Sequence, residues 1–261
     1  MNKAMCLVLL MIAPLVCSAQ WTEHPDLAAL FRTANVDGAF VVRDPRTGAM
    51  AGYNEARART RFVPASTFKI AHSLIGVATG AVANVDEVLE YGGRPQPYPA
   101  WERDMSLRDA IAMSNVAIYR TLARRIGLED MGRYVRRLDY GNSLLGETVD
   151  RFWLDGPLRI SAVEQTVFLA RLAEKRLPLP EPVQAQVHEI MFNAQGQGWR
   201  LWAKSGWENA PGVGVGWWVG WVHAAGTDHA FALNLDMRDP AMAPLRESLA
   251  RACLQALRLL H

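Results

Sequence analysis

The sequence predicts an α+β fold, in which an antiparallel β-sheet is flanked by helices and a helical lobe is inserted between its strands. Short apolar runs broken by glycine lie near both ends of the chain, and the middle third has helical periodicity. Strands from both ends can share one sheet when the intervening segment folds beside them. We therefore expect a single domain over residues 20–261, with a sheet lobe at about 20–65 and 176–261 and a helical lobe at about 66–175.

The first expected elements are the two strands of a hairpin, DGAFVVRD (37–44) and TGAMAGYN (47–54), on either side of a Pro-Arg turn. Helical patterns follow in the middle third, where Ser106, Glu129 and Ser161 are suitable first residues for three helices. The expected helical segments are residues 64–79, 106–127, 129–138 and 161–175.

A proline-rich joint, LPLPEP (177–182), introduces the C-terminal third, which is expected to begin with one short helix. Aromatic and β-branched runs that glycine interrupts then predict three antiparallel strands. These runs are WRLWAKSG (199–206), VGWWVGWVHA (215–224) and HAFALNLDM (229–237). An amphipathic helix within residues 242–260 is expected to complete the domain.

The first nineteen residues, MNKAMCLVLLMIAPLVCSA, have the pattern of a secretory signal peptide. Lys3 precedes an apolar run over residues 4–16, and the small residue Ala19 ends the segment. The apolar run is shorter than the ~20 residues that a membrane-spanning helix needs. We therefore expect cleavage near Ala19 and export to the periplasm of a Gram-negative-type cell.

The remaining composition argues against several classes of protein. Lys and Arg total 28 against 26 Asp and Glu, without a block of like charge, so no nucleic-acid partner is expected. No apolar run long enough to span a bilayer follows residue 19, so the mature chain is not expected to enter a membrane. The six histidines lack metal-binding spacing, so no metal is expected. Cys253 is the sole cysteine after residue 19, which leaves the exported chain without an internal disulfide.

One charged residue interrupts an otherwise apolar helical segment, PASTFKIAHSLIG. Lys69 lies three positions after Ser66, so on a helix the two side chains share a face. After residue 19 the chain keeps only Lys69, Lys175 and Lys204 and otherwise uses arginine, which does not give up its proton. A lysine among apolar neighbours such as Phe68 can have a lowered pKa and activate a serine hydroxyl. A lysine that extends to solvent at a helix end is the alternative.

A second cation and two further hydroxyl groups extend this pattern. Lys204, Ser205 and Gly206 follow one another on an expected strand. The cation and the hydroxyl can bind a carboxylate, and the glycine admits a ligand close to the backbone. An ordinary turn after the strand is the alternative for this triplet. Ser114, which Asn115 and Val116 follow, supplies another hydroxyl that can relay a proton.

In chain order, three motifs resemble those of the penicillin-recognising serine enzymes: Ser66-x-x-Lys69, Ser114-x-Val116 and Lys204-Ser205-Gly206. Three further segments resemble class D, the oxacillinase-type β-lactamases: Tyr140-Gly141-Asn142, Phe152-Trp153-Leu154 and GWWVGW at 216–221. A class A β-lactamase would carry Ser-Asp-Asn at the second motif. The resemblance runs from about Asp37 into the C-terminal helix, nearly the whole exported chain.

The resemblance implies hydrolysis of β-lactams, an activity that confers antibiotic resistance, and it implies a role for each matching residue. Ser66 would be the nucleophile, and Lys69 would react with carbon dioxide to form N6-carboxylysine, the general base. Ser114 would pass a proton to the β-lactam nitrogen with the help of Lys204. Carbon dioxide or bicarbonate would be required, and no cofactor. The implied pocket around the carboxylated lysine consists of Phe68, Val116, Trp153 and Leu154.

The resemblance also implies how the substrate is held. Backbone N–H groups of Ser66 and Trp207 would form the oxyanion hole, and Ser205, Gly206, Trp207 and Arg246 would bind the substrate. Arg246 is favoured over the nearby Arg238 for the substrate carboxylate, because the family pattern aligns with it without a gap. Ser205 replaces the threonine of many members, and Trp207-Glu208-Asn209-Ala210 departs from the family, so the preferred β-lactam is left open.

Two groups of residues near these motifs are expected to be structural. His72, one turn after Lys69, is expected to be a packed helix residue. Trp217, Trp218 and Trp221 are expected to pack in the core rather than to form a sugar-binding platform.

Two alternatives to a hydrolase are a β-lactam sensor that stays acylated and a cell-wall transpeptidase or carboxypeptidase. Sensor domains adjoin transmembrane segments, and no such segment follows residue 19. The compact length and the Tyr-Gly-Asn and Trp153 matches disfavour a transpeptidase. The sequence leaves the oligomeric state open.

Overall fold

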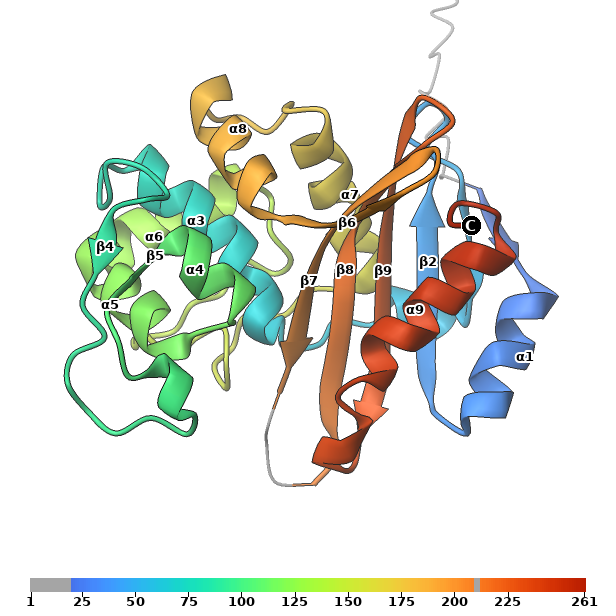
Figure 1. Cartoon of the computed structure of the whole chain (residues 1–261), viewed down its shortest axis with the longest axis horizontal. Helices are drawn as coiled ribbons and strands as arrows, with labels where there is room; N and C mark the ends of the chain where they lie inside the picture. Colours follow the sequence, from blue (N-terminus) through green and yellow to red (C-terminus); the bar gives the residue numbers. More distant parts are fainter. Residues whose placement is uncertain (1–19, 209–211) are drawn as a thin grey trace, which may run out of the picture.

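One sheet of seven strands unites the two ends of the chain, as the sequence predicts. The computed structural model describes residues 20–208 and 212–261, and its sheet order is β1-β3-β2-β9-β8-β7-β6 (Figure 1). Every neighbouring pair is antiparallel except β1 and β3. The strands are β1 (Trp21–Glu23), β2 (Gly38–Arg43), β3 (Met50–Tyr53), β6 (Phe192–Gly196), β7 (Trp199–Trp207), β8 (Gly214–Ala224) and β9 (Thr227–Met237).

The aromatic run of β8 packs against both faces of this sheet. Trp217 and Trp221 join the larger core, which the sheet shares with the helical part, while Trp218 joins the core on the opposite face. Because neighbouring residues of a strand point to opposite faces, consecutive tryptophans serve the two cores. The three side chains are at most 2% exposed, so the expected core packing is confirmed.

Helices cover both faces of the sheet. α1 (Pro25–Ala34) and α9 (Leu245–Ala256) lie side by side on the face toward the viewer in Figure 1, and α7 (Ala162–Ala173) packs on the other face. α7 begins with a capping box, because Ser161 Oγ accepts from the Glu164 N–H and the Glu164 carboxylate accepts from the Ser161 N–H. The predicted helix start at Ser161 is therefore confirmed.

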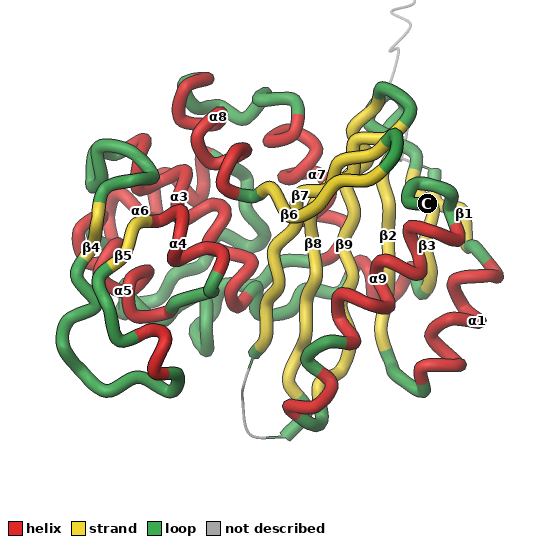
Figure 2. The backbone as a smooth tube through the Cα atoms, viewed as in Figure 1, coloured by secondary structure: helices red, strands yellow, loops and turns green. Residues whose placement is uncertain are grey.

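The helical part lies beside the β7 edge of the sheet (Figure 2). Ser106 caps α4 as predicted, and α6 begins one residue before the predicted Glu129. The helices of this part are α3 (Lys69–Ala78), α4 (Leu107–Ala112), α5 (Val116–Ile126), α6 (Leu128–Arg137) and α8 (Glu181–Ile190). The shorter elements of the chain are α2 (Glu55–Arg59), the strand pair β4 (Val88–Leu89) and β5 (Met105–Ser106), and the 3-10 helices η1 (Ala65–Phe68), η2 (Pro99–Trp101) and η3 (Pro240–Met242).

The structure differs from the sequence prediction at several elements. The helical segment predicted over residues 106–127 is interrupted, because Ser114 has a left-handed backbone (φ 57°) and α5 begins only after it. β1, α1 and the edge strand β6 were not predicted, and all but one of the five residues of β6 are exposed, so no alternating pattern marks it. α7, which was expected in the helical lobe, packs on the sheet. α8, which was expected in the sheet lobe, packs against α3. The predicted signal peptide, Asn209 and Ala210 lie outside the described residues.

We expect the indole of Trp217 to stabilise the fold through a specific hydrogen bond. Trp217 Nε1 donates to Val63 O over 2.8 Å, whereas Trp221 Nε1 is buried and has no partner in the part of the chain that the structure describes. A change of Trp217 to Phe leaves a buried carbonyl unpaired, at a cost of ~1–3 kcal/mol, while the same change at Trp221 removes an unpaired donor. In urea denaturation, both substitutions should lower the free energy of unfolding. The loss in Trp217→Phe should exceed the loss in Trp221→Phe by ~1–3 kcal/mol. Equal losses would contradict this role.

Candidate active site

Ser66 lies where the sheet and the helical part meet. It is in the single turn of η1 that leads into α3, and its side chain is half-buried. The residue before it, Ala65, has a left-handed backbone (φ 48°), a conformation that costs energy for a residue with a Cβ. The surrounding contacts must therefore hold this turn in place.

Side chains from distant segments hold the Ser66 turn. Trp217 of β8 donates to Val63 O, and Thr67 Oγ1 donates to Pro64 O over 2.7 Å. Gln165 of α7 donates to Thr67 Oγ1 over 2.8 Å. The turn is thus tied to both the sheet and α7, and its geometry does not depend on local sequence alone.

Lys69 is the first residue of α3 and is 0% exposed. Its Nζ lies 2.7 Å from Ser66 Oγ and 5.3 Å from the centre of the Tyr119 ring. No carboxylate within the described residues forms an ion pair with it. Burial holds the pKa of Lys69 well below its ordinary value because it desolvates the ammonium ion, and Lys204 and Arg120 repel the charge further. The surroundings of Lys69 therefore favour the neutral amine, the form that can accept a proton.

Ser114 and Lys204 form a second serine-lysine pair. Lys204 Nζ donates to Ser114 Oγ over 3.0 Å and to Ser205 O over 2.9 Å. Asn115, which follows the left-handed Ser114, caps α5, because its carboxamide oxygen accepts the N–H groups of Ala117 and Ile118. The predicted second motif is thus also the N-cap of a helix.

Burial and the charge of Arg246 lower the pKa of Lys204 to about 7. Both forms of this lysine are consequently populated at neutral pH. Arg246, the second residue of α9, donates to Gly206 O over 2.6 Å and to Ala243 O over 2.9 Å. Arg238, the competing residue, is exposed and pairs with Asp37. The structure therefore brings Arg246, and not Arg238, next to the Lys204-Ser205-Gly206 segment.

Gly206 lets β7 approach the Ser66 turn. A Cβ at this residue would lie 3.0 Å from Thr67 Cγ2 and 3.1 Å from Pro64 O, tighter than ordinary contacts. The pairing of β7 with β8 fixes the direction of the next backbone donor, the N–H of Trp207. Glu208 N donates to Val215 O, and the alternation of an antiparallel ladder then points the Trp207 N–H away from β8, toward this turn.

The side chains predicted to surround Lys69 are all buried or half-buried. Phe68 and Trp153 are buried and stack with their ring centres 6.1 Å apart, and Val116 and Leu154 are half-buried. Trp153 Nε1 is buried and has no hydrogen-bond partner among the described residues. This indole N–H is available to a group that brings an acceptor oxygen.

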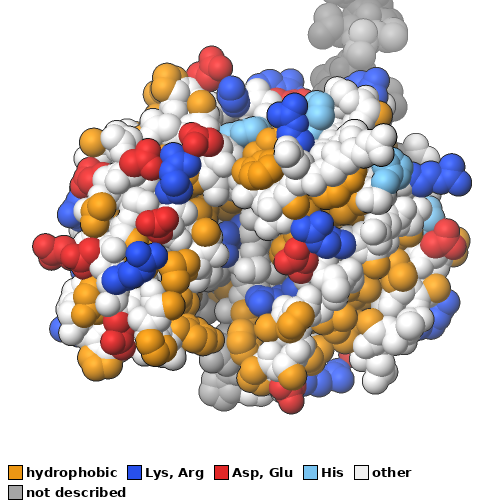
Figure 3. Space-filling view, in the orientation of Figure 1, with side chains coloured by type: hydrophobic (Ala, Val, Ile, Leu, Met, Phe, Trp, Pro, Cys, Tyr) orange, Lys and Arg blue, Asp and Glu red, His pale blue; other side chains and the backbone are white. Residues whose placement is uncertain are grey.

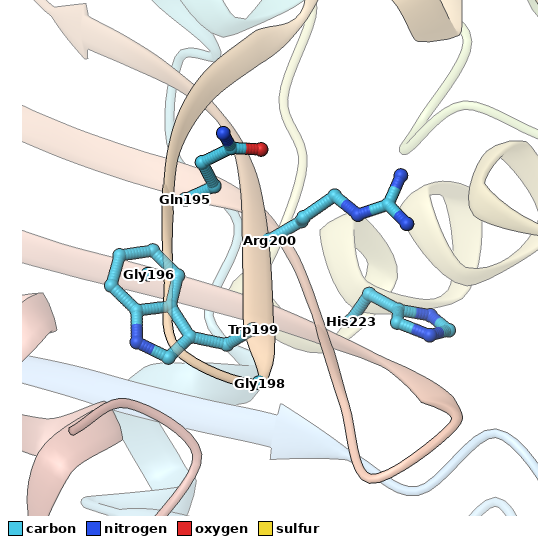
Figure 4. Close-up of a pocket in the computed structure, with 6 residues that line it drawn as sticks. All are labelled: Gln195, Gly196, Gly198, Trp199, Arg200 and His223. Carbon is cyan, nitrogen blue, oxygen red and sulfur yellow. The ribbon is translucent and has the colours of Figure 1, made fainter.

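The surface is hollowed between the helical part and the sheet, with basic side chains visible in the hollow (Figure 3). A separate cavity of about 440 Å³ lies at the turn between β6 and β7 and has Trp199 on one side and Arg200 and His223 on the other (Figure 4). It is at the start of β7, roughly 16 Å along the strand from Lys204. It is therefore distinct from the serine-lysine cluster.

Sequence reasoning missed the residues that hold the cluster together. Thr67, Gln165 and Trp217 position the nucleophile turn, and Tyr119 contacts the Lys69 amine. Gln165 is 98 positions from Thr67, so no local pattern links them. The Tyr-Gly-Asn motif carried a partial signal, because Tyr140 OH also lies within 3.5 Å of Gln165 Nε2.

Known proteins are similar to this chain in sequence and in fold. The family model for the penicillin binding protein transpeptidase domain matches residues 38–255, which defines the class as the penicillin-recognising serine enzymes. The β-lactamase OXA-5 of Pseudomonas aeruginosa is 35% identical over 249 residues, covering 94% of this chain and 92% of the relative. The β-lactamase OXA-48 of Klebsiella pneumoniae is 33% identical over 253 residues, with 97% and 96% coverage.

A solved structure agrees with these relatives. The class D β-lactamase FUS-1 (OXA-85) from Fusobacterium nucleatum subsp. polymorphum has a TM-score of 0.88 and 37% identity, covering 92% of this chain and all of that chain. The chain belongs to the class D β-lactamases and is a serine β-lactamase.

We expect a methyl group at Gly206 to impair catalysis more than stability. Gly206→Ala pushes β7 away from the Ser66 turn by a few tenths of an ångström, and small misplacements of reacting groups are costly. Initial-rate kinetics should show a loss in kcat/KM of about tenfold or more. Gly132→Ala in α6 is the control, since its Cβ meets only the flexible end of Arg136. Unchanged kcat/KM in Gly206→Ala would contradict the close-approach argument.

Proposed function

We propose that this protein hydrolyses β-lactam antibiotics through an acyl-enzyme on Ser66, with N-carboxylated Lys69 as the general base for acylation and deacylation. Membership of the class D β-lactamases supports the hydrolysis and its consequence, antibiotic resistance. The single observation that carries the mechanism is the burial of Lys69 beside Ser66 without a carboxylate partner.

The environment of Lys69 favours its reaction with carbon dioxide. Its neutral nitrogen forms a bond to the carbon and releases a proton to water, so an amine becomes an anionic carbamate. Lys204 and Arg120, which repel an ammonium ion at this position, attract an anion. When present, the carboxylate supplies a base that takes a proton from Ser66 Oγ and later from the hydrolytic water.

The residues of the pocket fit such a group. Trp153 Nε1, which has no acceptor in the described parts of the chain, would donate to a carboxylate oxygen. Phe68, Val116 and Leu154 would exclude water from it, which strengthens each polar interaction inside the pocket. No cofactor besides carbon dioxide or bicarbonate is required by this scheme.

The second serine-lysine pair would serve the leaving group. As the C–N bond of the tetrahedral intermediate breaks, Ser114 would donate its proton to the β-lactam nitrogen, and Lys204 at 3.0 Å would replace that proton. A lysine whose pKa is lowered to about 7 is suited to this transfer, because it exchanges protons readily at neutral pH.

The substrate would bind along β7. The cations Lys204 and Arg246, with the Ser205 hydroxyl, would hold its carboxylate by charge-assisted hydrogen bonds. The N–H groups of Ser66 and Trp207 would stabilise the oxyanion, in agreement with the direction of the Trp207 N–H.

The protein would act after export, as its first nineteen residues suggest. In the described part of the chain, no helix is both long and apolar enough to cross a membrane. No group of three His, Cys, Asp or Glu side chains there is arranged to hold a metal ion. Similarity to β-lactamases supports a small-molecule β-lactam as the substrate.

Many turnovers per molecule are the expected result of mixing the protein with a chromogenic cephalosporin. Absorbance should continue to change far beyond one equivalent, and Ser66→Ala should abolish the reaction. Mass spectrometry of a quenched mixture should show the acyl adduct on the Ser66 peptide. A reaction that stops after one equivalent would instead indicate a sensor or a transpeptidase.

Bicarbonate should restore activity on the acid side of the pH profile. Since the pKa of Lys69 is lowered, the amine is neutral above that pKa and becomes an ammonium ion as the pH falls, which releases carbon dioxide. Rates measured at acidic pH should therefore rise with added bicarbonate in the wild type, and sodium chloride at equal ionic strength is the control. Lys69→Ala should lose turnover and should not respond to bicarbonate, and any acyl-enzyme that it forms should hydrolyse more slowly than that of the wild type. Hydrolysis rates at acidic pH that do not change with bicarbonate would contradict the proposal that carboxylated Lys69 is the base.

A further inference from the structure

His72 is a buried polar side chain that packing does not explain. It is 0% exposed, and neither Nδ1 nor Nε2 has a hydrogen-bond partner among the described residues. A leucine would fill an apolar helix position without leaving two ring nitrogens unpaired, and such groups cost about 1–3 kcal/mol when buried. The packed position expected from the sequence is present, but its polarity requires a separate reason.

The position of His72 links it to Lys69. The two residues are three apart on α3, so their side chains are neighbours on one face of the helix. Both contact the Tyr119 ring, at 5.3 Å from Lys69 Nζ and 5.3 Å between ring centres for His72. The His72 and Trp153 rings lie edge to face, with their centres 5.0 Å apart.

The pocket therefore contains an excess of donors. Trp153 supplies one indole N–H without an acceptor, and a neutral imidazole supplies one N–H and one acceptor nitrogen. Burial and the nearby Lys69 hold the pKa of His72 well below its ordinary value, so the ring is neutral. Tyr119 OH is already paired with Ser73 Oγ at 2.7 Å.

We propose that His72 is a positioning residue that donates a ring N–H to the carboxylate formed on Lys69, as a second donor beside Trp153. This inference rests on the proposed function, since it requires the modified lysine. It assigns the indole donor of Trp153 and the imidazole donor of His72 to the two oxygens of one anionic group. Two donors on different elements fix the rotation of the carboxylate and so its aim at Ser66.

The consequence is a contribution to carbon dioxide retention. A hydrogen bond to a buried anion is stronger than one between neutral groups, and its loss raises the free energy of the carboxylated state relative to the free amine. Substitution of His72 should therefore weaken carboxylation itself, before any effect on substrate.

The experiment titrates the purified protein with ¹³C-labelled bicarbonate and follows the carbamate signal by NMR. His72→Leu removes the ring nitrogens, and His72→Asn keeps an N–H donor. His188→Leu is the matched control, because His188 also packs against tryptophan rings, Trp202 and Trp221, and not against Lys69. Lys69→Ala identifies the signal.

His72→Leu should raise the half-saturating bicarbonate concentration by about tenfold or more, the effect of one hydrogen bond to a charged group. The half-saturating bicarbonate concentration of His72→Asn should stay within about threefold of the wild-type value, and that of His188→Leu should equal the wild-type value. If His72→Leu required the same bicarbonate concentration as the wild type, the role of His72 would be overturned and the proposed base would stand. A wild type without a Lys69-dependent carbamate signal would overturn the proposed base as well.

A second measurement covers the case in which His72→Leu does not fold. In wild-type protein labelled with ¹⁵N-histidine, the resonance missing from His72→Asn identifies the His72 ring. That resonance should shift when bicarbonate is added and should stay fixed in Lys69→Ala. A His72 resonance that bicarbonate leaves unmoved overturns the proposal.

Discussion

The burial of an amine that has no counter-ion among residues 20–208 and 212–261 is the constraint around which the site is built. Lys69 is fully buried and lies against Tyr119 and Ser66, and the nearest charges that affect it are cations. An ammonium ion would be strongly destabilised in these surroundings, so the fold selects the neutral amine. The reactivity proposed for this lysine, toward a proton or toward carbon dioxide, depends on that selection.

Holding this arrangement requires contacts from both parts of the fold. Hydrogen bonds from Trp217 and Gln165 tie the strained turn at Ala65 to β8 and α7. Gly206 has no side chain, so β7 can pack closely against this turn. Because reacting groups must be placed to within fractions of an ångström, these anchors matter as much as the reacting side chains. The junction of the two parts thus contains two left-handed residues, Ala65 and Ser114, beside the side chains proposed to react.

The sequence predicts those parts of the site that local spacing determines. Ser66 and Lys69 are one helical turn apart, and Lys204 precedes Ser205 on a strand, so both motifs could be found without a structure. It does not predict the interruption at Ser114, which a left-handed residue and the Asn115 cap produce within a continuous helical pattern. Nor does it predict β6, because an exposed edge strand lacks the alternation that marks a half-buried one. The unpaired nitrogens of His72 are equally invisible in sequence, since a partner's absence is a tertiary property.

Those unpaired groups also connect the chemistry to stability. A pocket that buries the Trp153 and His72 nitrogens without acceptors is costly in the unmodified protein, and that cost would be relieved by the anion these donors are proposed to bind. Anything that binds the native state and not the unfolded chain stabilises it by mass action. Carbon dioxide would then act as a stabilising ligand as well as the source of the base. The same donors that destabilise the free-amine form would set how strongly the carboxylated form is retained.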